Sequence, residues 1–222
     1  MPARGVVIDL DGTLLDTIPD LAAGVNAMLA DLGRAPLSVD RVACYVGKGV
    51  EALVHRALSG RLDGHAEPAL FAAGYPSFIT HYERENGRHS KPFPGVLEGL
   101  DAMRQAGLRL ACVTNKPMAF TAPLLERSGL AGYFDAMVGG DTLSKRKPDP
   151  LPMRYACEQL RCPPHLVLAI GDSLNDALAA RAAGMPVLAV PYGYNEGRDV
   201  RSLDVDGIVD SLAEAARWIE PV

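Results

Sequence analysis

The fold is decided by the stretch VVIDLDGT, residues 6–13, in which a run of apolar residues leads directly into two carboxylates. Unbroken apolar character is typical of a parallel strand that is buried on both faces. Because side chains repeat along a strand with a period of two, Asp9 and Asp11 leave it on the same side, at its carboxyl end. Open α/β sheets bind their ligands at that end. The stretch therefore predicts a buried parallel strand with a ligand site beside it.

Short apolar runs alternate with helical segments along the rest of the chain. Runs that predict strands occupy residues 6–10, 108–114, 136–138, 167–170, 187–190 and 208–209. Helical periodicity lies between them at residues 96–106, 120–128, 151–160 and 175–183, and three of these helices are expected to end at Gly107, Gly129 and Gly184. The alternation predicts an α/β fold with a doubly wound parallel sheet, that is, a Rossmann-like core.

Residues 17–87 interrupt this rhythm, because they contain no strong strand signal. Apolar residues between Leu21 and Leu32 fall on one face of a helix, and those between Val50 and Leu58 repeat the spacing. We interpret the interval as a helical cap inserted after the first strand. Residues 1–16 and 88–222 would then form the α/β core, and residues 17–87 are called the cap segment below.

Length and composition exclude several classes of protein. The 222 residues leave room for one large domain, or for one with a modest insertion. A net charge of −5 argues against a general nucleic-acid partner. No uncharged stretch approaches the roughly 20 apolar residues of a membrane helix, and no signal-peptide pattern opens the chain. The four cysteines lack CxxC spacing, so we expect reduced thiols and a cytoplasmic protein without a membrane partner. The sequence carries no signal for oligomeric state.

The two carboxylates Asp9 and Asp11 point to a metal ion. Close carboxylates repel each other and resist ionising together unless a proton or a cation intervenes. A hard divalent cation with oxygen ligands is the natural partner, which favours Mg²⁺. Taken alone, the motif has an alternative interpretation as an Asp-Gly turn with solvated acids.

Three other segments bring polar groups to strand ends or to a restrained loop. Thr114 and Asn115 end one apolar run, where a hydroxyl and an amide can donate to a phosphoryl oxygen. Lys147 precedes two prolines, which restrict the backbone and limit where its ammonium points. Asp172 follows another run, and Asp176 lies one helical turn beyond it. Each segment alone could be a plain loop or helix end, but together they strengthen the interpretation of a metal site.

In this order the segments resemble the four motifs of the haloacid dehalogenase-like phosphatases. Those motifs are Asp-x-Asp-Gly-Thr, a Thr or Ser, a Lys, and Gly-Asp-x-x-x-Asp, and the match runs from residue 6 to about residue 176. The insertion at residues 17–87 is similar to the family's helical cap. Leu10 departs from the commoner Phe or Met, but we expect this side chain to point into the core. Further stretches at 93–96, 113–117, 139–141 and 192–195 resemble the subgroup that hydrolyses 2-phosphoglycolate.

The resemblance implies a phosphoric monoester hydrolase with defined roles for the carboxylates. Asp9 would attack phosphorus to form an aspartyl-phosphate, and Asp11 would act first as general acid and then as general base. Mg²⁺ would be held by Asp9, the main-chain carbonyl of Asp11, and Asp172. Asp176 would orient a water on the metal or the ammonium of Lys147. An exposed acid at a helix N-terminus is the alternative for Asp176.

The same resemblance implies a phosphate-binding set of Thr114, Asn115 and Lys147. Substrate choice must come from the cap segment, because the core motifs address only the phosphoryl group. Gly47 and Gly49 let the backbone approach a ligand, and Lys48 between them could pair with a substrate carboxylate, or it could be a solvated lysine in a turn.

The expected substrate is a small phosphate monoester, and 2-phosphoglycolate is the first candidate. N-acetylmuramic acid 6-phosphate, another sugar phosphate, and a sugar-phosphate mutase activity remain open. A phosphorylated receiver module has no use for a cap, and a haloacid dehalogenase would lack the acid at Asp11.

Overall fold

The computed structural model describes all 222 residues and is built on a six-stranded parallel sheet. Its strands, in spatial order, are β6 (Ala136–Val138), β5 (Arg109–Val113), β2 (Gly5–Ile8), β7 (Val167–Gly171), β8 (Val187–Ala189) and β9 (Gly207–Ile208). The chain moves outward from β2 to β6 and then returns to the other side of β2 for β7. The expected doubly wound sheet is confirmed, and the residues after β2 lie where the strand order reverses, which is where such sheets bind ligands.

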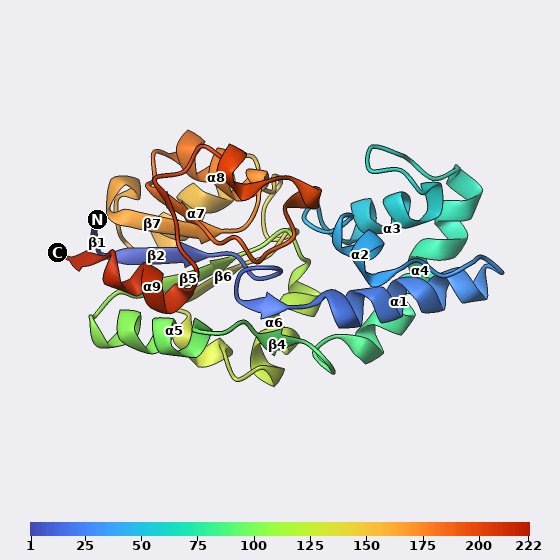
Figure 1. Ribbon diagram of the computed structural model, residues 1–222, viewed down its shortest axis with the longest axis horizontal. Helices are drawn as coiled ribbons and strands as arrows, with labels where there is room; N and C mark the ends of the chain where they lie inside the picture. Colours follow the sequence, from blue (N-terminus) through green and yellow to red (C-terminus); the bar gives the residue numbers. More distant parts are fainter.

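Helices cover both faces of the sheet (Figure 1). One face carries α5 (Val96–Gln105), α6 (Met118–Arg127) and α9 (Leu212–Arg217), and the other carries α7 (Leu151–Gln159) and α8 (Leu174–Ala183). The period of two along β2 explains the division, because Val6 and Ile8 pack with the first group of helices and Val7 packs with the second. All four residues of β2 are therefore buried.

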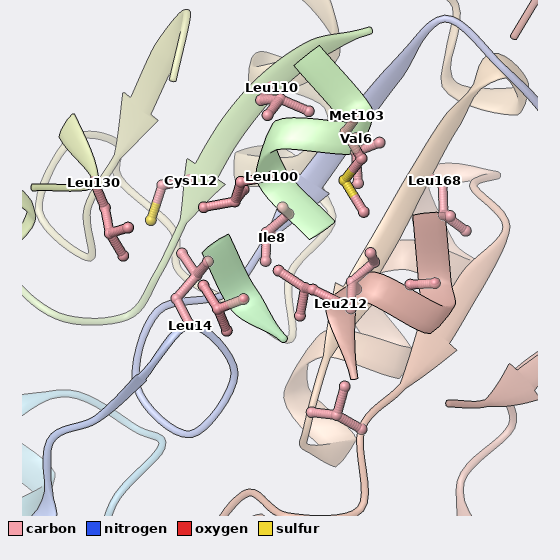
Figure 2. Close-up of a cluster of buried hydrophobic side chains, with 14 of the residues drawn as sticks. Val6, Ile8, Leu14, Leu100, Met103, Leu110, Cys112, Leu130, Leu168 and Leu212 are labelled. Atoms are coloured by element: carbon pink, nitrogen blue, oxygen red, sulfur yellow. The ribbon is translucent and has the colours of Figure 1, made fainter. Parts of the chain in front are cut away.

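The layer under α5 and α9 fixes the position of β2. Figure 2 shows Leu100 and Met103 of α5 and Leu212 of α9 beside strand residues such as Ile8. Leu10 is fully buried in the same cluster, as expected. Burying one such side chain contributes about 1.5–3 kcal/mol relative to exposure. The carboxylates that follow β2 are therefore attached to one of the most firmly packed parts of the molecule.

The cap segment forms a separate layer of helices beyond one end of the sheet (Figure 1). It contains α1 (Ile18–Asp31), α2 (Val39–Ala43), α3 (Val50–Ser59) and α4 (Pro68–Glu85). Apolar side chains of these helices, among them Val25, Phe78 and Tyr82, form a second hydrophobic cluster, which also takes in Phe120 of α6. The helical character expected for this interval is present, and the cap segment has its own packed interior.

Two crossings join the cap segment to the core. The entering strand β3 (Leu15–Asp16) pairs antiparallel with the returning strand β4 (Lys91–Pro92). Nearby, the buried carboxylate of Asp20 accepts hydrogen bonds of 2.6–3.0 Å from the backbone N–H groups of Gly87, His89 and Ser90 and from the Ser90 hydroxyl. One carboxylate thus holds both crossings together.

Differences from the predicted elements are confined to element ends and to very short strands. Leu10 does not extend β2, because its carbonyl accepts turn hydrogen bonds from the N–H groups of Leu14 and Leu15. The pairs β3–β4 and β1 (Pro2–Ala3) with β10 (Glu220–Pro221) were not predicted, since two residues carry no readable periodicity.

Three further features concern the cysteines, the glycines at helix ends and the apolar character of the helices. All four cysteines are free thiols, and three of them are buried. Gly107, Gly129 and Gly184 have positive φ angles just after α5, α6 and α8. None of the helices combines the length and apolar character needed to cross a bilayer.

We expect Asp20→Ala to lower the free energy of unfolding by roughly 2–4 kcal/mol, because it leaves three buried or half-buried N–H groups without an acceptor. Chemical denaturation of the purified variant measures the change. Asp63→Ala, at an exposed position, is the matched control and should unfold like the wild type. Equal stability of the Asp20→Ala variant and this control would contradict the structural role of Asp20.

Candidate active site

A cavity lies between the carboxyl ends of the central strands and the cap segment. The core residues that line it include Asp9, Asp11, Thr114, Asn115, Lys116, Lys147 and Asp172, and the cap segment contributes Gly47 and Gly49. All of the predicted core residues except Asp176 thus line a single cavity. Asp176 lies directly behind it, bonded to Lys147.

The ammonium of Lys147 is buried among three acceptors. Its Nζ lies 2.7 Å from Asp9 Oδ1, 2.6 Å from Asp176 Oδ1 and 2.7 Å from the Val113 carbonyl oxygen. Three acceptors use all three hydrogens of an ammonium. Burial alone lowers the pKa of Lys147, but the adjacent Asp176 and Asp9 more than offset this effect and raise it. The lysine is therefore a fixed cation that orients Asp9.

Asp172 is held by backbone and by glycine contacts. Its Oδ2 accepts the Tyr194 N–H at 2.6 Å, and its Oδ1 accepts the Thr13 hydroxyl at 3.3 Å. Gly12 has a φ of +88°, and a Cβ at this position would lie 2.5 Å from Asp172 Oδ2, so only glycine fits here. Burial, together with the charge of Asp176, raises the pKa of Asp172 to about 7, against the opposing hydrogen bond from Tyr194.

Asp9, Asp172 and Asp176 form a cluster whose carboxylate oxygens lie within 4.8 Å of one another. Burial also raises the pKa of Asp9 well above its ordinary value, although the charge of Lys147 opposes the shift. Burial disfavours the negative charge of these carboxylates more than Lys147 favours it, and a hard cation with oxygen ligands can supply the missing stabilisation. The donor set therefore fits Mg²⁺.

Asp176 is the member of this cluster with the least capacity for a metal. Its Oδ1 accepts Lys147, and its Oδ2 accepts the Ser173 hydroxyl at 2.6 Å and the Ser173 N–H at 3.2 Å. By contrast, Asp9 accepts a side-chain hydrogen bond on Oδ1 alone. The Asp9 carboxylate accepts one hydrogen bond and that of Asp172 two, so both keep more free lone pairs for a cation than Asp176, which accepts three and holds Lys147 in place.

Asp11 belongs to a second ion pair rather than to the cluster. Its Oδ1 accepts the Thr17 hydroxyl at 2.6 Å and the Lys116 ammonium at 2.8 Å. Asp9 and Asp11 do line one cavity, although β2 ends at Ile8 and a turn, not the strand period of two, places Asp11 there. However, each has a lysine of its own, so their mutual repulsion is already reduced without a cation directly between them.

Lys116 is the main residue that sequence reasoning missed. Its side chain is 3% exposed and lines the cavity, and its Nζ lies 5.1 Å from the centroid of the Tyr82 ring. Burial lowers the pKa of Lys116, but the Asp11 charge outweighs this effect and raises it, so the side chain is a cation. Its position one residue after Asn115, at the same strand end, was the available signal.

Asn115 joins three loops around the cavity. Its Nδ2 donates to the carbonyl oxygens of Gly47 and Lys147, each at 2.9 Å. The amide hydrogens that were expected to hold a phosphoryl oxygen are therefore used to fix two loops. Thr114 is buried beside it, and its Oγ1 accepts the Lys116 N–H at 3.1 Å.

The loop of the cap segment that holds Gly47 and Gly49, called the cap loop below, contributes backbone to the cavity, but the structure does not bring Lys48 into it. The Gly47 carbonyl accepts Asn175 Nδ2 at 3.2 Å in addition to Asn115, which seats the loop on the core. Lys48 does not line the cavity, its side chain is 46% exposed, and its Nζ lies 3.7 Å from Glu196 Oε1. The expected pairing of Lys48 with a substrate carboxylate is therefore not offered by this arrangement, because the side chain points to Glu196.

A doubly wound sheet with buried carboxylates and lysines at its switch point is typical of α/β enzymes, and the acidic cluster is one that could hold a metal ion. The family model of the haloacid dehalogenase-like hydrolases matches residues 3–184, and the chain belongs to this family. The family expected from the four motifs is confirmed, and with it the expectation of a hydrolase.

Individual relatives agree with this assignment. The chain is 54% identical over 220 residues to a phosphoglycolate phosphatase of Nitrosospira multiformis, covering 99% of this chain and 97% of the relative. It is 54% identical over 219 residues to that of Thiobacillus denitrificans, with coverage of 99% and 96%. A solved structure, of a predicted phosphoglycolate phosphatase from Haemophilus somnus 129PT, matches with a TM-score of 0.91 and 32% identity over 97% of each chain.

We expect the metal-free protein to lose stability as the pH rises. The pKa of Asp172 is about 7 in the folded state against an ordinary value of 3.8, so between these values the folded state binds the proton more tightly. The free energy of unfolding therefore falls across this window and levels off above it. Thermal unfolding in EDTA at about pH 5 and about pH 8 should show a smaller decrease for Asp172→Asn than for the wild type. Equal decreases would contradict the raised pKa.

Proposed function

We propose that this chain is a Mg²⁺-dependent phosphatase that hydrolyses 2-phosphoglycolate to glycolate and phosphate through an aspartyl-phosphate. The observation that carries the proposal is the pair Asp9 and Asp11, which share one cavity but are held by separate lysines. Such a pair can divide the work of nucleophile and of acid and base. The names of the relatives at 54% identity support the substrate.

In the first step Asp9 attacks phosphorus. Lys147 binds Asp9 Oδ1, so Oδ2 is the oxygen free to form the new bond. As the bond from phosphorus to the ester oxygen breaks, Asp11 donates a proton to the leaving glycolate oxygen. In the second step Asp11 takes a proton from water, which attacks phosphorus, breaks the bond to Asp9 and releases phosphate. Thr17 and Lys116 hold the Asp11 carboxylate through both steps.

The cation site of the proposal comprises Asp9, Asp172 and the main-chain carbonyl of Asp11. When bound, Mg²⁺ supplies positive charge that stabilises the charge developing on the phosphoryl group. The Thr114 hydroxyl is the proposed side-chain contact to the phosphoryl oxygens. Lys147, whose three ammonium hydrogens are already used, acts there through its charge and by holding Asp9. Asp176 acts on Lys147, and Asn115 acts by positioning the main chain around Lys147.

The same proposal gives the two parts of the chain, the core and the cap segment, different roles. Residues 1–16 and 88–222 form the catalytic core, and residues 17–87 form the cap that closes over the substrate. The two hydrogen bonds that seat the Gly47 carbonyl on the core support a closing role for the cap. The four free thiols suit a reducing compartment, which supports a cytoplasmic location.

A panel of phosphate esters tests the substrate. With Mg²⁺ the wild type should release phosphate from 2-phosphoglycolate with a higher kcat/KM than from sugar phosphates or N-acetylmuramic acid 6-phosphate, and EDTA should abolish the release. Asp9→Asn is the control, since it keeps the shape of the side chain but removes the nucleophile, and it should retain at most a few per cent of turnover. Isomerised sugar phosphate in place of free phosphate would indicate a mutase and refute the proposal.

Asp11→Asn should slow turnover much more for alkyl phosphates than for p-nitrophenyl phosphate. A good leaving group departs without a proton, so losing the general acid costs it less, whereas general acid–base catalysis typically contributes about 10²–10⁴-fold. Steady-state kinetics on both substrates measure the difference. Equal losses on the two substrates would remove Asp11 from the role of general acid.

A further inference from the structure

Building on the proposed function, we propose that Lys116 binds the carboxylate of the substrate. It would thereby select phosphate esters that carry a carboxylate on the carbon attached to the ester oxygen. The inference starts from a buried lysine that lines the cavity and donates a hydrogen bond to Asp11, the proposed general acid. This lysine has more ammonium hydrogens than acceptors.

The spare donors become clear when the two lysines of the cavity are compared. Lys147 has three acceptors, one for each of its ammonium hydrogens. Lys116 has one acceptor within 3.5 Å, Asp11 Oδ1 at 2.8 Å, and the Tyr82 side chain is its other polar neighbour, so at least one of its three ammonium hydrogens is left without an acceptor. A buried cation with unused N–H groups is costly unless a ligand accepts from it. Lys116 can therefore donate a hydrogen bond to an anionic oxygen of a ligand.

The chemistry of the reaction places such an oxygen beside Lys116. The ester oxygen must lie against Asp11, because Asp11 protonates it. In 2-phosphoglycolate three covalent bonds separate this oxygen from the carboxylate oxygens, so the carboxylate lies next to the Asp11 side chain. Lys116 Nζ lies 2.8 Å from the Asp11 carboxylate. The same lysine can therefore contact both the acid and the substrate carboxylate.

Arg56 and Lys48 are cations near the cavity, but both bind acceptors outside it. The guanidinium of Arg56 is buried, but it donates to the carbonyl oxygens of Tyr45 and Leu62 and to Glu196. Lys48 points to the same Glu196 and does not line the cavity. Lys147 and Lys116 are the cations among the lining residues, and Lys147 serves Asp9. This leaves Lys116 for the carboxylate.

The test compares 2-phosphoglycolate with its neutral amide, the phosphate ester of glycolamide. Both share the reacting groups, so the ratio of their kcat/KM values cancels any general damage that a variant causes at Asp11. Lys116→Met should lower this ratio by about ten- to a hundredfold, the effect of losing a buried charge-assisted hydrogen bond. Lys116→Arg, which keeps the charge, should retain most of the preference. Lys91→Met, at an exposed lysine in β4, is the matched control and should leave the ratio unchanged.

A binding measurement covers the case in which Lys116→Met is inactive. Calorimetric titration of 2-phosphoglycolate into Asp9→Asn, and into the double variant Asp9→Asn/Lys116→Met, should show affinity at least about tenfold weaker in the double variant. An unchanged ratio together with unchanged affinity would overturn the inference, as would a loss of preference in Lys48→Met instead. Failure of the wild type to hydrolyse 2-phosphoglycolate would overturn the proposed function itself, so the two failures are distinguishable.

Discussion

The ammonium of Lys147, buried between Asp9 and Asp176, is the interaction on which the arrangement of the cavity depends. It connects the end of β2, the loop that carries Lys147, and the first turn of α8. A buried ion pair that loses one partner typically destabilises a protein by about 3–5 kcal/mol, because the remaining charge stays buried without compensation. Asp176 therefore has a structural task, and this task explains why its two oxygens are already occupied by hydrogen bonds.

The second ion pair, between Lys116 and Asp11, lets two carboxylates lie in one cavity. Two like charges 4 Å apart at an effective dielectric constant of 20 repel by about 4 kcal/mol. A lysine within 2.8 Å of each carboxylate offsets this repulsion and gives the two residues different surroundings. Asp9 sits deep in the acidic cluster, whereas Asp11 contacts the Thr17 hydroxyl at the entrance to the cap segment. Different surroundings are what assign different roles to two chemically identical groups.

Most of the core part of the site could be predicted, because residues that follow the strands of a parallel sheet come together at one edge of that sheet. Asp9, Thr114 and Asp172 each follow an apolar run, and the carboxyl ends of parallel strands meet at one edge. The place of Lys48 could not be predicted in the same way. Whether Lys48 enters the cavity depends on how the cap loop packs on the core, and this packing leaves no periodic pattern in the sequence. The two-residue strands at the crossings are too short to leave one either.

The cap loop and the acidic site are coupled through residues that belong to neither alone. Asn115 binds the Gly47 carbonyl of the cap loop and the Lys147 carbonyl of the core. On the opposite side, Tyr194 donates its N–H to Asp172, while its hydroxyl accepts the Thr17 N–H at 2.8 Å. Thr17 in turn holds Asp11. Movement of the cap segment about its crossings would therefore shift the hydrogen bonds of Lys147, Asp172 and Asp11 together. In the proposed mechanism these carboxylates therefore act with the cap loop seated, since a site shielded from water strengthens electrostatic interactions.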